Sequence, residues 1–222
     1  MQPELPIVIK NSADLVAVFS DLGTEVGPRY KRTKDQKEWY CLRCYMLALG
    51  VRGILNYPIE IGKAEPPDFI LADPVRGRYG VEVTEATEED WQRELARTER
   101  DYTAECMENS RSAFLTSDDG WVGDSPEKLW RISVLRAIGR KIKSISRPDY
   151  PVGCCDLLIL EQSRSGIVVD RAKAIQLLRV AVPYIAQLTK ITNRLGRITV
   201  LSGQLVLYDL LGAFQVIDSD SA

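Results

Sequence analysis

Hydrophobic and polar residues alternate with a period of two from about position 59 onward, which predicts β-strands. Residues 69–72 and 79–84 form two such runs, and Asp73, Pro74 and Gly77 between them are typical turn residues. We therefore expect an antiparallel pair of strands joined by a short turn.

A second strand pattern is the unbroken hydrophobic run over 157–160, inside the segment 155–160. Such a run is typical of a strand that is buried on both faces of a sheet. Farther along, 198–201 and 205–208 flank Ser202 and Gly203 and resemble two strands of a hairpin.

Helices are predicted where hydrophobic residues recur three and four positions apart. These helices are expected at 12–22, 34–49, 88–108, 126–146 and 170–188. Ser125 and Asp170 are suitable caps for the last two, and Pro183 is expected to kink or break the final helix.

The order of these elements predicts an α/β fold with a mixed central β-sheet flanked by helices. Composition shows no domain boundary. We assign 1–33 to an N-terminal appendage and 34–222 to the main domain, which ends in a helix and strand extension.

The composition and net charge limit the chemical functions that this chain can have. The 222 residues carry 29 Lys and Arg against 31 Asp and Glu, a net charge of −2, so a nucleic-acid surface must be a local patch. The chain has no histidine, which excludes Ser-His and Cys-His nucleophile pairs and histidine bases. The five cysteines, without a basic leader or a long apolar run, predict a reduced, cytoplasmic protein with no membrane segment.

Two carboxylates stand out at the predicted strand pair. Asp68 opens the first strand after Pro67, and Glu82 lies on the second strand, on the same face as Thr84. If the register joins them, their charges converge and favour a hard divalent cation such as Mg²⁺ or Mn²⁺. The alternative is an incidental pair, a turn aspartate beside an edge glutamate.

At these residues the chain resembles the PD-(D/E)XK superfamily of nucleases. Pro67-Asp68 matches the first part of the motif and Glu82 matches its second acid. The resemblance spans about residues 34–161 and implies a restriction-endonuclease-like core with N-terminal and C-terminal additions. It also implies a magnesium site and hydrolysis of phosphodiester bonds in nucleic acid.

One residue departs from this pattern, because Thr84 stands where the family has its lysine. A neutral side chain cannot supply positive charge to the reaction. Lys141 is the replacement we favour, since it borders the hydrophobic face of the helix over 126–146, and Lys63 is its rival. A lysine reaching along the surface to solvent is the alternative for Lys141.

Further candidates come from the helices. Glu38 resembles the helical acid that many family members add to the metal site, although a charge on the helix surface is the commoner reason for a glutamate at such a position. The basic residues on the solvent side of 126–146 and just after it are candidate phosphate contacts, or else a solvated face. They are Arg136, Arg140, Lys143 and Arg147.

The sequence therefore predicts a Mg²⁺-dependent endonuclease with catalytic Asp68, Glu82, Thr84 and Lys141 and metal ligands Asp68, Glu82 and Glu38. Its expected partner is nucleic acid, with DNA favoured over RNA. Two alternatives stay open: an inactive nuclease fold that binds nucleic acid or a protein, and an unrelated α/β interaction protein. A homodimer is one open oligomeric state.

Overall fold

The computed structural model describes residues 5–21, 33–87, 125–161, 169–189, 193–202, 205–211 and 215–217. The helices are α1 (Ser12–Asp21), α2 (Lys34–Val51), α5 (Ser125–Ile145) and α6 (Arg171–Thr189). The strands are β1 (Ile7–Ile9), β2 (Ile59–Lys63), β3 (Phe69–Asp73), β4 (Gly77–Ala86), β5 (Cys155–Glu161), β6 (Leu195–Ser202), β7 (Leu205–Leu211) and β8 (Gln215–Ile217).

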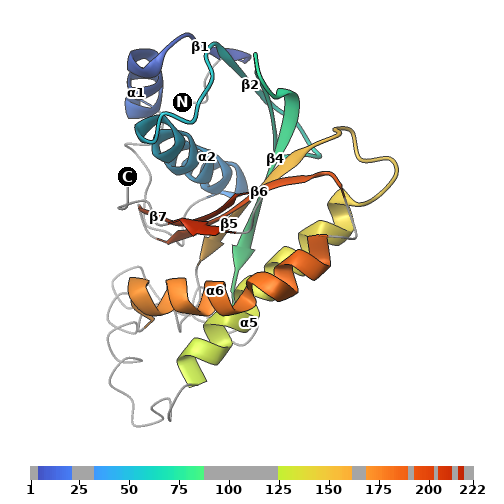
Figure 1. Cartoon of the computed structure of the whole chain (residues 1–222). Coiled ribbons are helices and arrows are strands. Elements are labelled where there is room, and N and C mark those ends of the chain that lie inside the picture. Colours follow the sequence, from blue (N-terminus) through green and yellow to red (C-terminus); the bar gives the residue numbers. More distant parts are fainter. Residues whose placement is uncertain are drawn as a thin grey trace, which may run out of the picture.

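These strands form one mixed sheet whose spatial order follows the chain, from β1 to β8. Strands β1 to β4 pair antiparallel, β5 lies parallel to β4 and β6 parallel to β5, and β6 to β8 are antiparallel again. The crossover from β4 to the parallel strand β5 contains α5, and the crossover from β5 to β6 contains α6 (Figure 1). The expected α/β fold with a mixed sheet flanked by helices is confirmed.

The helices cover opposite faces of this sheet, as Figure 1 shows for α1 and α2 on one side and α5 and α6 on the other. Strand β5 divides its side chains between the two cores. Leu158 and Leu160 pack in the cluster that contains α1 and α2, whereas Leu157 and Ile159 pack in the cluster formed with α5 and α6. Burial of both faces explains why residues 157–160 of β5 are continuously hydrophobic.

The strand pair expected at 69–72 and 79–84 is confirmed as β3 and β4. Their register pairs Phe69 with Val81 and Asp73 with Gly77. Gly77 has a φ of 67°, a left-handed conformation that glycine adopts without steric cost, so the turn depends on this residue. The hairpin expected after residue 198 is confirmed as β6 and β7.

Other elements differ from expectation at their ends. Helix α2 runs through Gly50 to Val51, and α6 continues through Pro183 without a break. The helix expected at 88–108 lies outside the described residues. No helix in the described part of the chain is both long and apolar enough to cross a membrane.

The N-terminal segment contributes to the same core as the rest of the sheet. Strand β1 was not predicted, yet it pairs with β2 through three residues, Ile7 to Ile9. Leu15 and Phe19 of α1 are buried in the cluster that also contains α2. Residues 5–21 are therefore built into the fold although they precede the boundary that we assigned at residue 33.

Candidate metal and phosphodiester site

Asp68 and Glu82 lie next to each other because of the β3–β4 register. Phe69 pairs with Val81, and the two strands are antiparallel. Asp68, which precedes Phe69, and Glu82, which follows Val81, are therefore neighbours at this end of the pairing. Asp68 Oδ2 also accepts a hydrogen bond from the Val83 backbone N–H at 2.6 Å. The two carboxyl side chains are buried, with residue exposures of 4% for Asp68 and 3% for Glu82.

Burial changes the acidity of Asp68. Desolvation of the carboxyl raises its pKa to about 7, and the nearby charges of Glu82 and Glu38 act in the same direction. The hydrogen bond from Val83 and the positive charge of Lys141 oppose this rise. From the sequence, the carboxylates converge only if the strand register joins them. In the fold they are neighbours, and the negative charges around Asp68 help to raise its pKa.

Among the described residues, Glu38, Glu65 and Asp68 form a group of three neighbouring carboxylates. One oxygen from each falls within 4.8 Å of the other two. Around an octahedral Mg²⁺ ion, adjacent ligand oxygens are about 3.0 Å apart and opposite ones about 4.2 Å apart, so the three carboxylates would draw closer together to share one ion. The acidic cluster, as we name these three residues, fits a hard divalent cation. Glu65 was not among the residues selected from the sequence.

Helix α2 brings Glu38 to this cluster. Thr33 caps the helix: its hydroxyl accepts from the Gln36 backbone N–H at 3.2 Å, and the Gln36 side chain accepts from the Thr33 N–H at 2.9 Å. This reciprocal cap fixes the first turn of α2. Glu38, one turn inside the helix, is only 5% exposed, so it is a buried acid facing the sheet and not a surface charge.

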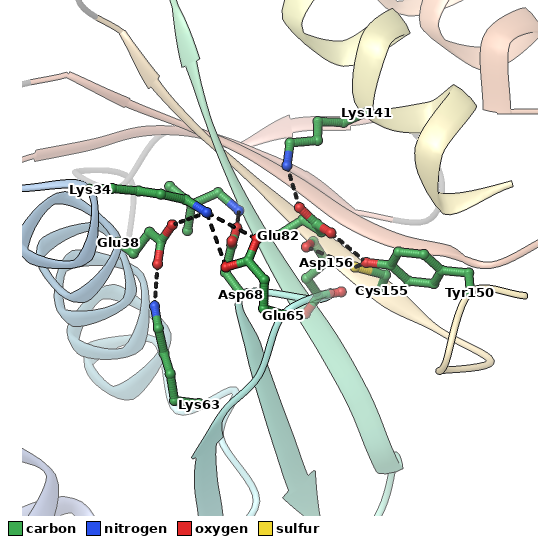
Figure 2. Close-up of polar contacts among 11 residues, drawn as sticks. Lys34, Glu38, Lys63, Glu65, Asp68, Glu82, Lys141, Tyr150, Cys155 and Asp156 are labelled. Atoms are coloured by element: carbon green, nitrogen blue, oxygen red, sulfur yellow. Dashed lines mark hydrogen bonds and ion pairs between the residues drawn. The ribbon is translucent and has the colours of Figure 1, made fainter. Parts of the chain in front are cut away.

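Glu82 has a different environment from the acidic cluster. Its Oε2 is in contact with the Lys141 ammonium, and its Oε1 accepts a hydrogen bond from the Tyr150 hydroxyl at 2.8 Å. Figure 2 shows Lys141 and Tyr150 reaching Glu82 from two directions, with Asp68 between Glu82 and Glu38. Each carboxylate oxygen of Glu82 is thus fixed by one donor.

Lys141 is therefore where the helical angle predicted it, on the sheet side of α5 and against one of the two acids. Its side chain is 27% exposed, which leaves the ammonium open to the adjacent cleft. Lys63, the rival, contacts Glu38 Oε2 and lies 3.1 Å from Asp35 Oδ1. Its ammonium also sits 4.2 Å from the centroid of the Phe69 ring. Both lysines border the carboxylates, and only Lys141 touches Glu82.

Thr84 and Lys141 line one cleft of about 580 Å³. The cleft lies between α2, the end of β4 and α5, and its lining residues are Lys34, Lys37, Glu38, Val83, Thr84, Glu85, Arg140, Lys141, Ser144 and Leu160. Thr84 is half-buried. The strand position of the expected lysine and the helical lysine that we proposed as its replacement thus face the same space.

The four basic residues predicted to contact phosphate are exposed on α5 and directly after it: Arg136, Arg140, Lys143 and Arg147. Arg140 lies nearest the carboxylates, because it lines the cleft and its Nη2 donates to the Glu85 carbonyl at 3.4 Å. Arg140 is the one of these four residues that lines the cleft. Use of this face by nucleic acid stays a prediction.

A further buried acid, Asp156, lies close to the site but belongs to a separate network (Figure 2). Arg76 donates to both of its oxygens at 2.7 Å, and the Tyr45 hydroxyl donates at 2.7 Å. The Arg197 backbone N–H donates at 2.8 Å. With its charge neutralised and its oxygens already hydrogen-bonded, Asp156 is suited to joining β5 to α2, β6 and the turn before β4 and not to binding a cation.

Sequence reasoning did not place three residues beside these carboxylates: Lys34, Glu65 and Tyr150. Glu65 precedes Pro66 and Pro67 in a segment without periodicity, and its only signal was its position three residues before Asp68. Tyr150 follows α5 in a short connection, and burial of its hydroxyl beside Glu82 raises its pKa. Comparison of the chain with protein-family models, with curated proteins and with solved structures found no match.

Proposed function

We propose that this protein is a metal-dependent nuclease of the PD-(D/E)XK type that hydrolyses phosphodiester bonds, with DNA as its expected substrate. The observation that carries the proposal is the contact between the Lys141 ammonium and Glu82, next to Asp68. It brings together two motif acids and a lysine, although the lysine comes from a helix and not from the strand that carries Glu82.

The order of elements supports this proposal. From α2 onward the described chain runs helix, three antiparallel strands, helix and a strand parallel to the third, which is the order expected of a restriction-endonuclease-like core. Asp68 precedes the second of these strands and Glu82 lies on the third. Strands β1 and β6 to β8 would then be additions to that core.

The chemistry divides among the residues of the site. Glu38, Glu65 and Asp68 would hold Mg²⁺ or Mn²⁺, with Glu82 beside them, and the ion would supply Lewis-acid stabilisation of charge on the phosphodiester. Lys141 donates to the attacking water or to a phosphate oxygen in the transition state. Glu82 orients Lys141, and Tyr150 fixes Glu82.

In the hydrolysis, the water oxygen forms a bond to phosphorus while the bond from phosphorus to the ester oxygen breaks. The attacking water loses one proton and the departing oxygen gains one. Arg140 lines the cleft, and it and the other exposed basic residues of α5 would hold the flanking phosphates.

The test is cleavage of single-stranded and double-stranded DNA and RNA by the purified protein with Mg²⁺ or Mn²⁺. We expect cleavage that EDTA abolishes and that Asp68→Asn and Lys141→Met each reduce at least a hundredfold. Lys128→Met is the matched control, because Lys128 is on the same helix about 20 Å away from Lys141 and should leave the rate unchanged. Circular dichroism verifies that each variant is folded.

Binding without cleavage is the second candidate, and Thr84 at the lysine position is the observation that favours it. It predicts that the protein retains an oligonucleotide in the presence of Mn²⁺ but leaves every substrate intact. That result would remove the enzyme proposal. Absence of both cleavage and binding would remove both candidates.

A further inference from the structure

Lys34 directs its ammonium into the acidic cluster. Its Nζ lies 3.0 Å from both carboxylate oxygens of Glu65 and 3.5 Å from Glu38 Oε1. Figure 2 shows the Lys34 ammonium among the carboxyl groups of Glu38, Glu65 and Asp68. A positive charge carried by the chain itself therefore stands where the cluster would hold a cation.

The two lysines near Glu38 differ in what they leave accessible. Lys63 contacts Glu38 Oε2, on the side of Asp35, and its side chain is 23% exposed. Lys34 contacts the other oxygen, Oε1, together with Glu65, and its side chain is 69% exposed. Lys63 thus contacts one oxygen of Glu38, whereas Lys34 contacts the other oxygen of Glu38 and both oxygens of Glu65 and is the more exposed of the two lysines.

We propose that Lys34 is a tethered cation that occupies the acidic cluster and that a divalent ion must displace it in order to bind. This inference rests on the metal site of the proposed function and adds its competitor. Lys34 and Glu65 are both largely exposed, so their ion pair is weak and the lysine is free to swing into solvent. When a singly charged ion replaces the ammonium, the positive charge at the acidic cluster stays the same, whereas a doubly charged ion adds one positive charge there. Lys34 thereby makes the site selective for divalent cations.

The test is the affinity for Mn²⁺ alone, measured by isothermal titration calorimetry at constant pH and low salt, without nucleic acid. Removing the competitor in Lys34→Met should tighten Mn²⁺ binding about three- to tenfold, since the lysine forms two ion pairs that are each weak. Lys34→Arg keeps the charge and should bind Mn²⁺ within about twofold of the unaltered protein.

Lys37→Met is the matched control. Lys37 is on the same helix and lines the same cleft, but its ammonium pairs with Glu85 Oε1 at 2.7 Å and makes no contact with the acidic cluster. It should change the Mn²⁺ affinity less than twofold. An equal gain in Lys34→Met and Lys37→Met would show that only the overall charge matters, and this would overturn the competitor role.

Asp68→Asn separates failure of this inference from failure of the proposed metal site. If Asp68→Asn abolishes Mn²⁺ binding while Lys34→Met leaves the affinity unchanged or weaker, the metal site stands and the competitor role is refuted. If the unaltered protein and Lys34→Met both fail to bind Mn²⁺, the metal site and the inference fall together.

Discussion

Placing a lysine at position 84 on the strand is the sharpest test of the role that we propose for Lys141. Thr84 lies two residues after Glu82 on β4, about 6.6 Å along the strand, and it lines the same cleft as Lys141. A lysine side chain at position 84 is long enough to bring its ammonium back to Glu82. We therefore expect Thr84→Lys to restore part of the activity that Lys141→Met removes.

The magnitudes follow from the contacts of Lys141. Loss of one charge-stabilising donor costs about 10²- to 10³-fold in rate, and the second substitution should recover at least about tenfold of it. Stability should also fall in Lys141→Met, because Glu82 is 3% exposed and loses its cationic partner. Tyr150 still donates to Glu82, so the loss in unfolding free energy should be about 1–3 kcal/mol, below the ~3–5 kcal/mol of a fully buried broken pair.

The assay compares initial cleavage rates of the single variants, the double variant and Thr84→Ala under one Mn²⁺ concentration, with urea unfolding for stability. Thr84→Ala should retain most of the activity because threonine carries no charge. The reasoning is refuted if the double variant is no faster than Lys141→Met while both fold and bind Mn²⁺ equally well. It is also refuted if Lys141→Met cleaves at the original rate.

Three further predictions test other parts of the site. Tyr150→Phe removes a hydrogen bond to a buried carboxylate, so urea unfolding should show a loss of about 1.5–3 kcal/mol, and an unchanged midpoint would contradict the role given to this hydroxyl. Burial raises the pKa of Asp68 to about 7 from 3.8, so its contribution to stability is complete below about pH 4 and is lost as the pH rises toward 7. Asp68→Asn, which does not titrate, should gain stability relative to the unaltered protein by about 1.4 kcal/mol per pH unit between about pH 5 and 6, where Asp68 is ionised in the unfolded chain and protonated in the folded one, and parallel pH curves without metal would exclude the shift. Replacing Arg136 and Lys143 together by Ala should reduce the slope of log affinity against log salt by about 1.8 for an oligonucleotide, whereas an equal slope would identify a merely solvated face.

Local patterns account for the parts of the fold that the sequence predicted. The β3–β4 pair follows from period-two alternation and from a turn that ends at a glycine with positive φ. Strand β5 was predicted from an unbroken hydrophobic run, which is typical of a strand that is covered on both faces of a sheet. These features also predicted that Asp68 and Glu82 would meet, because the register of a short hairpin leaves little freedom to its two ends.

The parts that escaped prediction depend on packing between distant segments. Glu65 joins the acidic cluster only because α2 is docked against the sheet, and Lys34 reaches it from the first turn of that helix. Tyr150 gains its role from the position of the chain after α5. The hydrophobic period of a helix, 3.6 residues, and that of a strand, 2 residues, each describe a single element. Neither period can therefore predict contacts between distant elements.

Under the proposed function, a lysine on a helix would do the work of a lysine on the strand that carries Glu82. On the strand, a lysine at position 84 would share its backbone with Glu82 and be fixed by the β4–β5 pairing, in which Thr84 lies opposite Ile159. From α5, Lys141 approaches the same carboxylate through the helix that packs on β4 and β5, and its position depends on that packing instead. The ion pair with Glu82 and the hydrogen bond from Tyr150 then supply the orientation that the strand backbone would have given. The position of Lys141 is therefore sensitive to the packing of α5. Ile138 and Ile142 are buried on either side of Lys141 in the sequence of this helix. Truncating either of them should displace the Lys141 ammonium and reduce its contribution to activity before the protein unfolds.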